Sequence, residues 1–343
     1  MRLLAASAEG HLQETITLAG GINSVITADR REPVCFELDM PLKNQNPIQY
    51  ELSIQSNGVW FVLQQERLIQ KRDKPRAKDP VFKHIDSHGQ DIMFFDPVSK
   101  KLTHPTWGYS SNETSLSQVP KMFKEPEDFR RILASSTLYH ALDVSARAPV
   151  RLPQPMTLAR FPGQNGEYLV SCLYYLRESE PDRFDAIEDT LKVVFPDFER
   201  LLFPPVAAGT LALGWKERQY LQPLNAHQLS EGTLRFLWLV TLLQSPELPT
   251  VTLIDEPEVS LHPEMLHLLS GLFREAATRT QLIVATHSER LVRFLEPSEL
   301  LICDSDEEGG MTLTRASALD LEAWLQDYSL DQLWEMGQLG GRI

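Results

Sequence analysis

Hydrophobic positions change their spacing along this chain of 343 residues. In one stretch they alternate with polar positions and are interrupted by turn-forming pairs such as Asn57-Gly58, which predicts an antiparallel β meander. A loop rich in Ser and Pro is expected next, and after it the apolar positions take the spacing of helices. The last part alternates helical segments with short apolar runs, a pattern typical of a parallel α/β layer. The expected parts are residues 1–29 as a helix end and connector, 30–97 as an antiparallel β lobe, 98–225 as a loop and helical lobe, and 226–343 as an α/β core.

One apolar run in the last part ends in two carboxylates. Residues 250–254 predict a strand buried on both faces, and Asp255 and Glu256 follow it directly. Because ligands bind beyond the carboxyl ends of parallel strands, both side chains would emerge where a substrate lies. One carboxylate can hold Mg²⁺ through its water shell, and the next can orient the water that attacks a phosphoryl group. A strand that stops at a solvated acidic turn has the same pattern. This motif alone supports the catalytic and the purely structural interpretation equally.

A second motif precedes a long apolar helix. It reads Ser230-Glu231-Gly232-Thr233, in which Ser230 is a good N-cap and Gly232 permits close backbone approach to a ligand. The free N–H groups and the dipole at this helix end favour an anion such as a terminal phosphate. An ordinary capped and buried helix has the same pattern, and for this motif alone it is the favoured interpretation.

A third motif lies at the end of another apolar run. Residues 281–286 predict a second buried strand that ends on His287, which can donate to a phosphate oxygen or to a neighbouring carbonyl. Residues 263–278 have the length of a crossover helix, so strand, helix and strand would form one right-handed parallel unit. That connection places His287 beside Asp255 and Glu256. Together the three motifs indicate one site rather than three unrelated features.

In this order the motifs resemble a known family, the ABC-type ATPase heads of the SMC/RecF lineage. The closer resemblance is to stand-alone bacterial AAA-class ATPases related to the ATPase part of overcoming-lysogenisation-defect nucleases. Residues 229–233 match the signature motif, 253–258 the Walker B motif, 259–263 the D-loop, and His287 the switch histidine. The resemblance implies an α/β, ABC-ATPase-head-like P-loop NTPase fold with an antiparallel β lobe and a helical lobe.

The resemblance also implies a function: binding and hydrolysis of ATP, with Mg²⁺, between the two heads of a homodimer. ATP-driven dimerisation would be coupled to an unknown partner, such as a separate effector chain, or to a nucleic-acid process. The implied site residues are Glu256 as general base and His287 as γ-phosphate sensor, Asp255 for the metal, and Ser230, Glu231, Gly232 and Thr233 for the nucleotide.

The sequence departs from this family at its start. None of its 17 glycines is followed by lysine, so the Walker A loop, Gly-x-x-x-x-Gly-Lys-Ser/Thr, is absent. Residues 1–6 resemble the helix that follows this loop, which predicts an N-terminally truncated fold and little ATP affinity for the sequence as written. Either the natural protein begins further upstream, or the chain is a degenerate, non-hydrolysing scaffold or regulatory protein. We favour the first because Ser230, Asp255, Glu256 and His287 keep functional identities.

Composition restricts the remaining function classes. A net charge of −14 argues against a protein that coats nucleic acid over its whole surface, but it does not exclude a local basic patch. Residues 67–78 carry six basic side chains, for which a solvated strand end or loop is favoured over nucleic-acid contact. Three widely spaced cysteines, and no apolar run near the ~20 residues of a membrane span, predict a soluble cytoplasmic protein.

One further set of candidate metal ligands lies in the predicted meander. His84, Asp86 and His88 alternate, and alternate residues on a strand share a face, so they could hold a metal ion. His88-Gly89 is also a plausible turn, and an exposed hairpin tip is the favoured interpretation.

Overall fold

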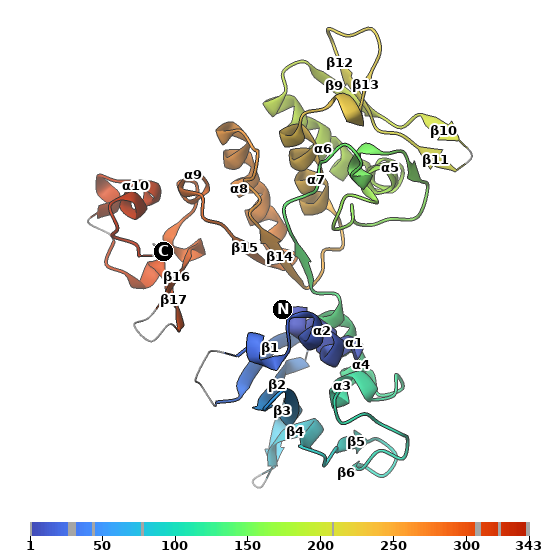
Figure 1. Ribbon diagram of the computed structural model, residues 1–343, viewed down its shortest axis with the longest axis vertical. Coiled ribbons are helices and arrows are strands. Elements are labelled where there is room, and N and C mark those ends of the chain that lie inside the picture. Colours follow the sequence, from blue (N-terminus) through green and yellow to red (C-terminus); the bar gives the residue numbers. More distant parts are fainter. Residues whose placement is uncertain are drawn as a thin grey trace. The chain divides into compact units, whose positions relative to one another are not determined.

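The chain divides into two compact units, Met1–Thr137 and Leu138–Ile343, in a computed structural model (Figure 1). The division falls inside the predicted 98–225 part, and the four-part organisation stays a prediction. No helix among the described residues is both long and apolar enough to cross a membrane. The structure describes residues 2–26, 32–42, 45–76, 79–207, 209–305, 310–321 and 324–340.

The first unit is built on one antiparallel sheet whose six strands follow sequence order. Its strands are β1 (Val34–Leu42), β2 (Gln45–Asn57), β3 (Trp60–Arg76), β4 (Asp79–His88), β5 (Phe94–Asp96) and β6 (Lys101–Thr103). Every neighbouring pair is antiparallel, and Gly58 takes the left-handed φ of 72° that the turn between β2 and β3 requires. The predicted meander is therefore confirmed for the described residues.

Short helices accompany this sheet. They are α1 (Arg2–Glu9), α2 (Leu12–Leu18), η1 (Ile22–Ser24), α3 (Ser115–Gln118) and α4 (Lys124–Ala134). Side chains from α1, α2 and α4 form one buried cluster with the alternate residues Tyr50, Leu52 and Ile54 of β2. Because successive side chains of a strand point to opposite faces, the alternating pattern of β2 gives the sheet one apolar face for these helices.

The second unit contains helices and several small sheets. Its helices are η2 (Pro149–Arg151), α5 (Leu169–Ser179), α6 (Pro181–Val194), η3 (Ala226–Gln228), α7 (Glu231–Gln244), α8 (Pro263–Ala277), α9 (Glu289–Val292), η4 (Pro297–Glu299), η5 (Ala316–Ala318), η6 (Trp324–Gln326) and α10 (Leu330–Glu335). Its strands are β7 (Thr137–Tyr139, which starts at the unit boundary), β8 (Gln154–Pro155), β9 (Phe198–Leu202), β10 (Pro205–Ala207), β11 (Thr210–Leu211), β12 (Gly214–Glu217), β13 (Leu224–Asn225), β14 (Val251–Asp255), β15 (Gln281–Ala285), β16 (Leu301–Ser305) and β17 (Met311–Arg315).

Helix α7 lies at the centre of the core of this unit. Ser230 caps it as predicted, because its Oγ accepts from the backbone N–H of Thr233 at 3.0 Å. From Phe236 onward the helix is buried almost all round, and it contacts α5, α6 and α8. A helix that is apolar on every side is stable only inside a core. This packing gives α7 a fixed position from which its first turn can present polar groups.

The sheet that matters for function has the order β15–β14–β7. Strands β14 and β15 are parallel and pair from Val251–Gln281 to Asp255–Ala285, with α8 as their connection. Figure 1 shows α8 beside these two strands, and α8 contacts β15. The predicted strand, helix and parallel strand are confirmed.

The predicted burial of β14 and β15 on both faces is wrong. Residues of β14 alternate between half-buried and buried, and residues of β15 alternate between exposed and half-buried. In the described sheet β15 is an edge strand, paired only with β14. An unbroken apolar run shows only that every position of the strand can be buried. Whether a face is buried depends on which other strands and helices cover it.

A hairpin follows in the last part of the chain. Strands β16 and β17 pair antiparallel from Leu301–Arg315 to Ser305–Met311. Residues 306–309, between the two strands, lie outside the described residues.

Candidate functional site

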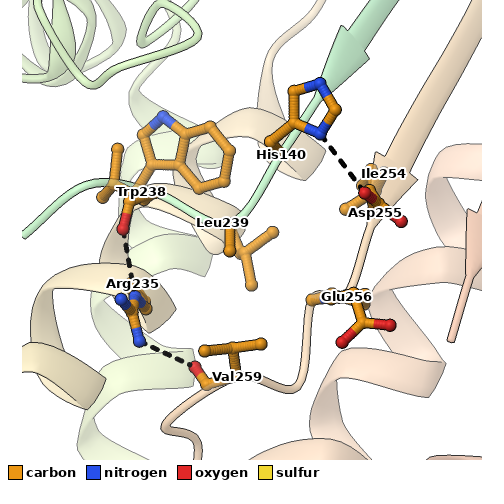
Figure 2. A pocket seen from close by; sticks show the side chains of 11 residues that line it. His140, Arg235, Trp238, Leu239, Ile254, Asp255, Glu256 and Val259 are labelled. Carbon is orange, nitrogen blue, oxygen red and sulfur yellow. Dashed lines mark hydrogen bonds and ion pairs between the residues drawn. The ribbon is translucent and has the colours of Figure 1, made fainter. Parts of the chain in front are cut away.

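The candidate site begins where β14 ends. Asp255 is the last residue of this strand, and the N–H of Glu256 still donates to the carbonyl of Ala285 at 2.9 Å. Glu256 then takes a left-handed φ of 51°. For a residue that is not glycine this conformation costs about 1–3 kcal/mol, and such strain is concentrated at functional sites. The turn directs the side chains of Asp255 and Glu256 into different surroundings, as Figure 2 shows.

Glu256 contacts the predicted switch histidine. Its Oε1 is hydrogen-bonded to Nδ1 of His287, which follows the end of β15 by two residues. The side chain of His287 is 78% exposed and that of Glu256 is 30% exposed, so water reaches both. The expectation that the crossover places His287 beside Asp255 and Glu256 is borne out for Glu256 by this contact. A carboxylate paired with an accessible imidazole can orient water and accept a proton.

Asp255 contacts a different histidine. Its Oδ2 lies 3.2 Å from Nδ1 of His140, the residue that follows β7 (Figure 2). Sequence reasoning missed His140 because it treated the surrounding residues as helical. The sequence did contain an indication of a strand end here: the apolar pair Leu138-Tyr139 is followed by a polar residue. The same pattern occurs at the ends of β14 and β15.

A pocket adjoins these groups. Among its described lining residues, Arg235 carries the permanent positive charge. The Arg235 guanidinium donates to the carbonyl of Leu142 at 3.1 Å and to Oγ of Ser260 at 2.5 Å. The side chain is only 15% exposed. Arg235 therefore holds three segments together: the one that follows His140, helix α7, and the segment after Glu256. It was also missed, because an arginine inside an apolar helix has no distinctive pattern.

The four signature residues, Ser230, Glu231, Gly232 and Thr233, do not line this pocket. Ser230 and Glu231 are exposed at the start of α7, whereas Thr233 is buried. A Cβ built on Gly232 would lie 2.5 Å from the carbonyl oxygen of Ser260. Glycine is thus required at position 232 for the close approach of α7 to the predicted D-loop.

Carboxylates at the site suit a divalent cation. Glu256, Glu258 and His287 each offer a ligand atom, and these atoms lie within 4.8 Å of one another. Asp255 stands outside this group, but its side chain is 42% exposed. Mg²⁺ prefers oxygen ligands and keeps several waters, so an accessible carboxylate fits it. Sequence reasoning gave Glu258 no role, although its signal was the third acid in Asp-Glu-Pro-Glu.

The alternative metal ligands of the first unit are not gathered around a common point. His84 is buried, its ring lies 4.7 Å from that of Phe82, and desolvation by burial lowers its pKa to about 4. His88 Nε2 lies 3.6 Å from Asp86 Oδ1, but Asp86 also pairs with Lys83 at 2.6 Å and Arg67 at 3.4 Å. Among the described residues, the group that could hold a metal ion does not include them.

The basic stretch at residues 67–78 can be followed only in part. Arg67 bridges Glu51 and Asp86, so its charge is neutralised within the sheet. Lys78 lies outside the described residues, and so do the side chains of Lys74 and Arg76.

Comparison with protein families gives one match. The profile of a family described as "AAA domain, putative AbiEii toxin, Type IV TA system" matches residues 3–293. The matched segment contains all the site residues described above. It confirms the resemblance to an AAA-class ATPase that the motifs indicated, and the described structure is α/β as predicted.

Solved structures of SMC heads are similar to the chain at low identity. A head bound to the C-winged helix domain of ScpA is 12% identical, with a TM-score of 0.42, over 91% of this chain and 85% of that one. A head with an extended coiled coil, bound to the C-terminal domain of ScpA from Pyrococcus furiosus, is 11% identical, with a TM-score of 0.42, over 97% and 88%. The SMC head domain from Thermotoga maritima is 10% identical, with a TM-score of 0.33, over 78% and 74%. No curated protein matches the chain.

Proposed function

The chain belongs to the family of AAA domains described as "putative AbiEii toxin, Type IV TA system", and from that premise we propose that it binds and hydrolyses ATP with Mg²⁺. The observation that carries this proposal is the contact between Glu256 and His287 just beyond the carboxyl ends of two parallel strands, one of which ends at Asp255. This is where open α/β sheets bind their ligands. The proposal places the reaction at the ends of β14 and β15.

Each of these side chains has a distinct part in the proposed reaction. The accessible carboxylate of Asp255 would hold Mg²⁺, which when bound neutralises charge on the phosphate oxygens. Glu256 would orient the attacking water and accept its proton. Because Nδ1 of His287 is engaged by Glu256, Nε2 is the ring nitrogen that would meet a γ-phosphate oxygen. Catalysis would rest on positioning and charge, as is usual for phosphoryl transfer.

The charge at the pocket supports a role for a second copy. A triphosphate needs cations or N–H donors, but Arg235 already donates to Leu142 and Ser260. Residues 230–233 form a helix start suited to an anion, and they lie outside the pocket of their own chain. We therefore propose that this segment acts on the nucleotide held by a second copy, in an ATP-dependent homodimer. The dimer would work in the cytoplasm with a separate effector chain or on nucleic acid.

The dimer can be trapped by stopping hydrolysis. In the protein purified from its own host, Glu256→Gln should bind MgATP and accumulate as a dimer, because the glutamine cannot take a proton from water. Wild-type protein should return to monomer as ATP is consumed. Glu264→Gln, at an exposed position at the start of α8, serves as the matched control and should behave as wild type. Sedimentation velocity measures the dimer fraction.

Two outcomes would contradict the proposal. A Glu256→Gln variant that hydrolyses ATP at the wild-type rate would remove Glu256 from the role of general base. Wild-type protein that does not bind MgATP in calorimetry would instead favour the non-hydrolysing scaffold, which a sequence without a Gly-Lys pair also allows.

A further inference from the structure

The side chain of His287 has one hydrogen-bond partner among the described residues. It is 78% exposed, and its ring contacts Glu256 through Nδ1. Apart from this hydrogen bond to Glu256, a ring so exposed has little side-chain packing to fix its orientation. What positions it must therefore act through the backbone of the short segment between β15 and α9.

That segment is fastened by the hydroxyl of Thr286. The Thr286 Oγ1 accepts from the backbone N–H of Ser288 at 3.0 Å, so one atom bridges the two residues that flank His287. The same hydroxyl donates to Oε1 of Glu258 at 2.6 Å. The donor and an acceptor position of Thr286 are thus both used, and the loop is tied to the segment that follows β14.

Glu258 itself is held by the turn after Glu256. The N–H of Val259 donates to the carbonyl of Glu256 at 3.3 Å, and the N–H of Leu261 donates to the carbonyl of Glu258 at 2.9 Å. Its Oε2 is buried and has no hydrogen-bond partner among the described residues. Burial of an unpaired carboxylate oxygen is unfavourable. The side-chain hydrogen bond that Glu258 does receive comes from Thr286, through Oε1.

We propose that Glu258 and Thr286 are positioning residues that hold the His287 loop against the end of β14, so that the imidazole meets Glu256. The catalytic consequence of this pairing rests on the proposed ATPase function, whereas the structural consequence does not. Glu258 and Thr286 are 28 residues apart in the sequence. Their hydrogen bond can form because β14 and β15 end at the same level of the sheet.

The first test follows the imidazole directly. The full-length protein is labelled with ¹⁵N-histidine, and the ring signals of His287 are assigned by comparison with His287→Asn. Thr286→Val, which keeps the shape and removes the hydroxyl, should move these signals toward those of a freely exposed imidazole. Thr286→Ser should restore them. Thr280→Val removes a buried hydroxyl near the opposite end of the same strand and should leave them unchanged.

Variants of Glu258 separate its hydrogen bond from other effects. Glu258→Ala should reproduce the shift seen in Thr286→Val, and the double variant should shift the signals no further, because both changes break one connection. Glu258→Gln retains an acceptor oxygen and should keep the signals close to wild type. Unchanged His287 signals in both Thr286→Val and Glu258→Ala would overturn the inference.

The second test measures turnover. Thr286→Val should lower kcat for ATP hydrolysis by roughly tenfold, with KM for ATP within about twofold, because a misplaced ring affects the reaction more than binding. Thr286→Ser should recover most of this loss. A Thr286→Val variant with shifted His287 signals and wild-type kcat would overturn the catalytic part. Absence of hydrolysis in wild-type protein would contradict the proposed function, while the ring signals would still decide whether the pair positions His287.

Discussion

Glutamate occupies two opposite settings in this chain. Glu66, on β3 of the first unit, is 2% exposed and accepts from the N–H groups of Ser115 at 2.5 Å and Leu116 at 2.9 Å, and from the Tyr50 hydroxyl at 3.0 Å. Glu256, after β14, has an accessible side chain, one histidine partner and a left-handed backbone. A buried carboxylate with several donors stabilises structure, whereas an open one retains acceptor capacity for a substrate.

The contacts of Glu66 explain why its burial is tolerated. Its oxygens receive two N–H groups from the start of α3, where helix donors lack intrahelical partners. Even so, desolvation by burial is the largest influence and raises the pKa of this carboxyl, while the hydrogen bonds act in the opposite direction. Charge alone therefore does not identify a reactive glutamate, because what differs between the two residues is access to water and free acceptor capacity.

A large effect is expected from removing Asp255, the accessible carboxylate next to Glu256. Asp255→Ala should lower Mg²⁺-dependent ATP turnover by roughly 10²–10³-fold, since the metal loses its protein ligand. Because Asp255 is 42% exposed, the free energy of unfolding should change by no more than about 1 kcal/mol. Turnover assays and urea unfolding measure the two effects. Asp189→Ala, at an exposed position on α6, is the control, and undiminished turnover of Asp255→Ala would contradict the proposed role of Asp255 in holding Mg²⁺.

The buried carboxylate should show the reverse behaviour. Glu66→Ala leaves two backbone donors and the Tyr50 hydroxyl without their acceptor, which should cost about 2–4 kcal/mol in the free energy of unfolding. Glu66→Gln keeps one acceptor oxygen and should cost less. Urea unfolding gives these values, and calorimetry should find the ATP affinity of the folded variants unchanged. A Glu66→Ala variant as stable as wild type would show that the network is dispensable.

The smallest expected effect is a dependence of stability on pH. Since burial raises the pKa of Glu66 in the folded state, the protonated form is the one that folding favours. Its contribution is fully present below the pKa of an unfolded glutamate and is lost as pH rises through the folded value. The stability of wild type relative to Glu66→Gln should therefore fall over this interval in melts at a series of pH values. A difference that is constant, or that grows with pH, would contradict the assigned cause.

The sequence predicts those parts of the site that short-range patterns encode. Asp255 and His287 follow apolar runs separated by a segment of crossover length, and Ser230 precedes a long apolar helix, so their elements are correctly predicted. The sequence did not predict His140 as a site residue, because β7 has three residues, too few to show the alternation typical of a strand. The link between Glu258 and Thr286 depends on how two strand ends align, which no local pattern contains. The exposure of β15 likewise depends on its place at the edge of the sheet.

The most direct test of the ATPase site is the rate of ATP hydrolysis by the natural protein and two matched variants. Glu256→Gln removes the proposed general base, and Glu264→Gln makes the same change at an exposed position outside the site. We expect Glu256→Gln to lower kcat by roughly 10²–10⁴-fold and Glu264→Gln to leave it unchanged. Equal turnover by Glu256→Gln and wild type would contradict the conclusion that hydrolysis takes place at the ends of β14 and β15.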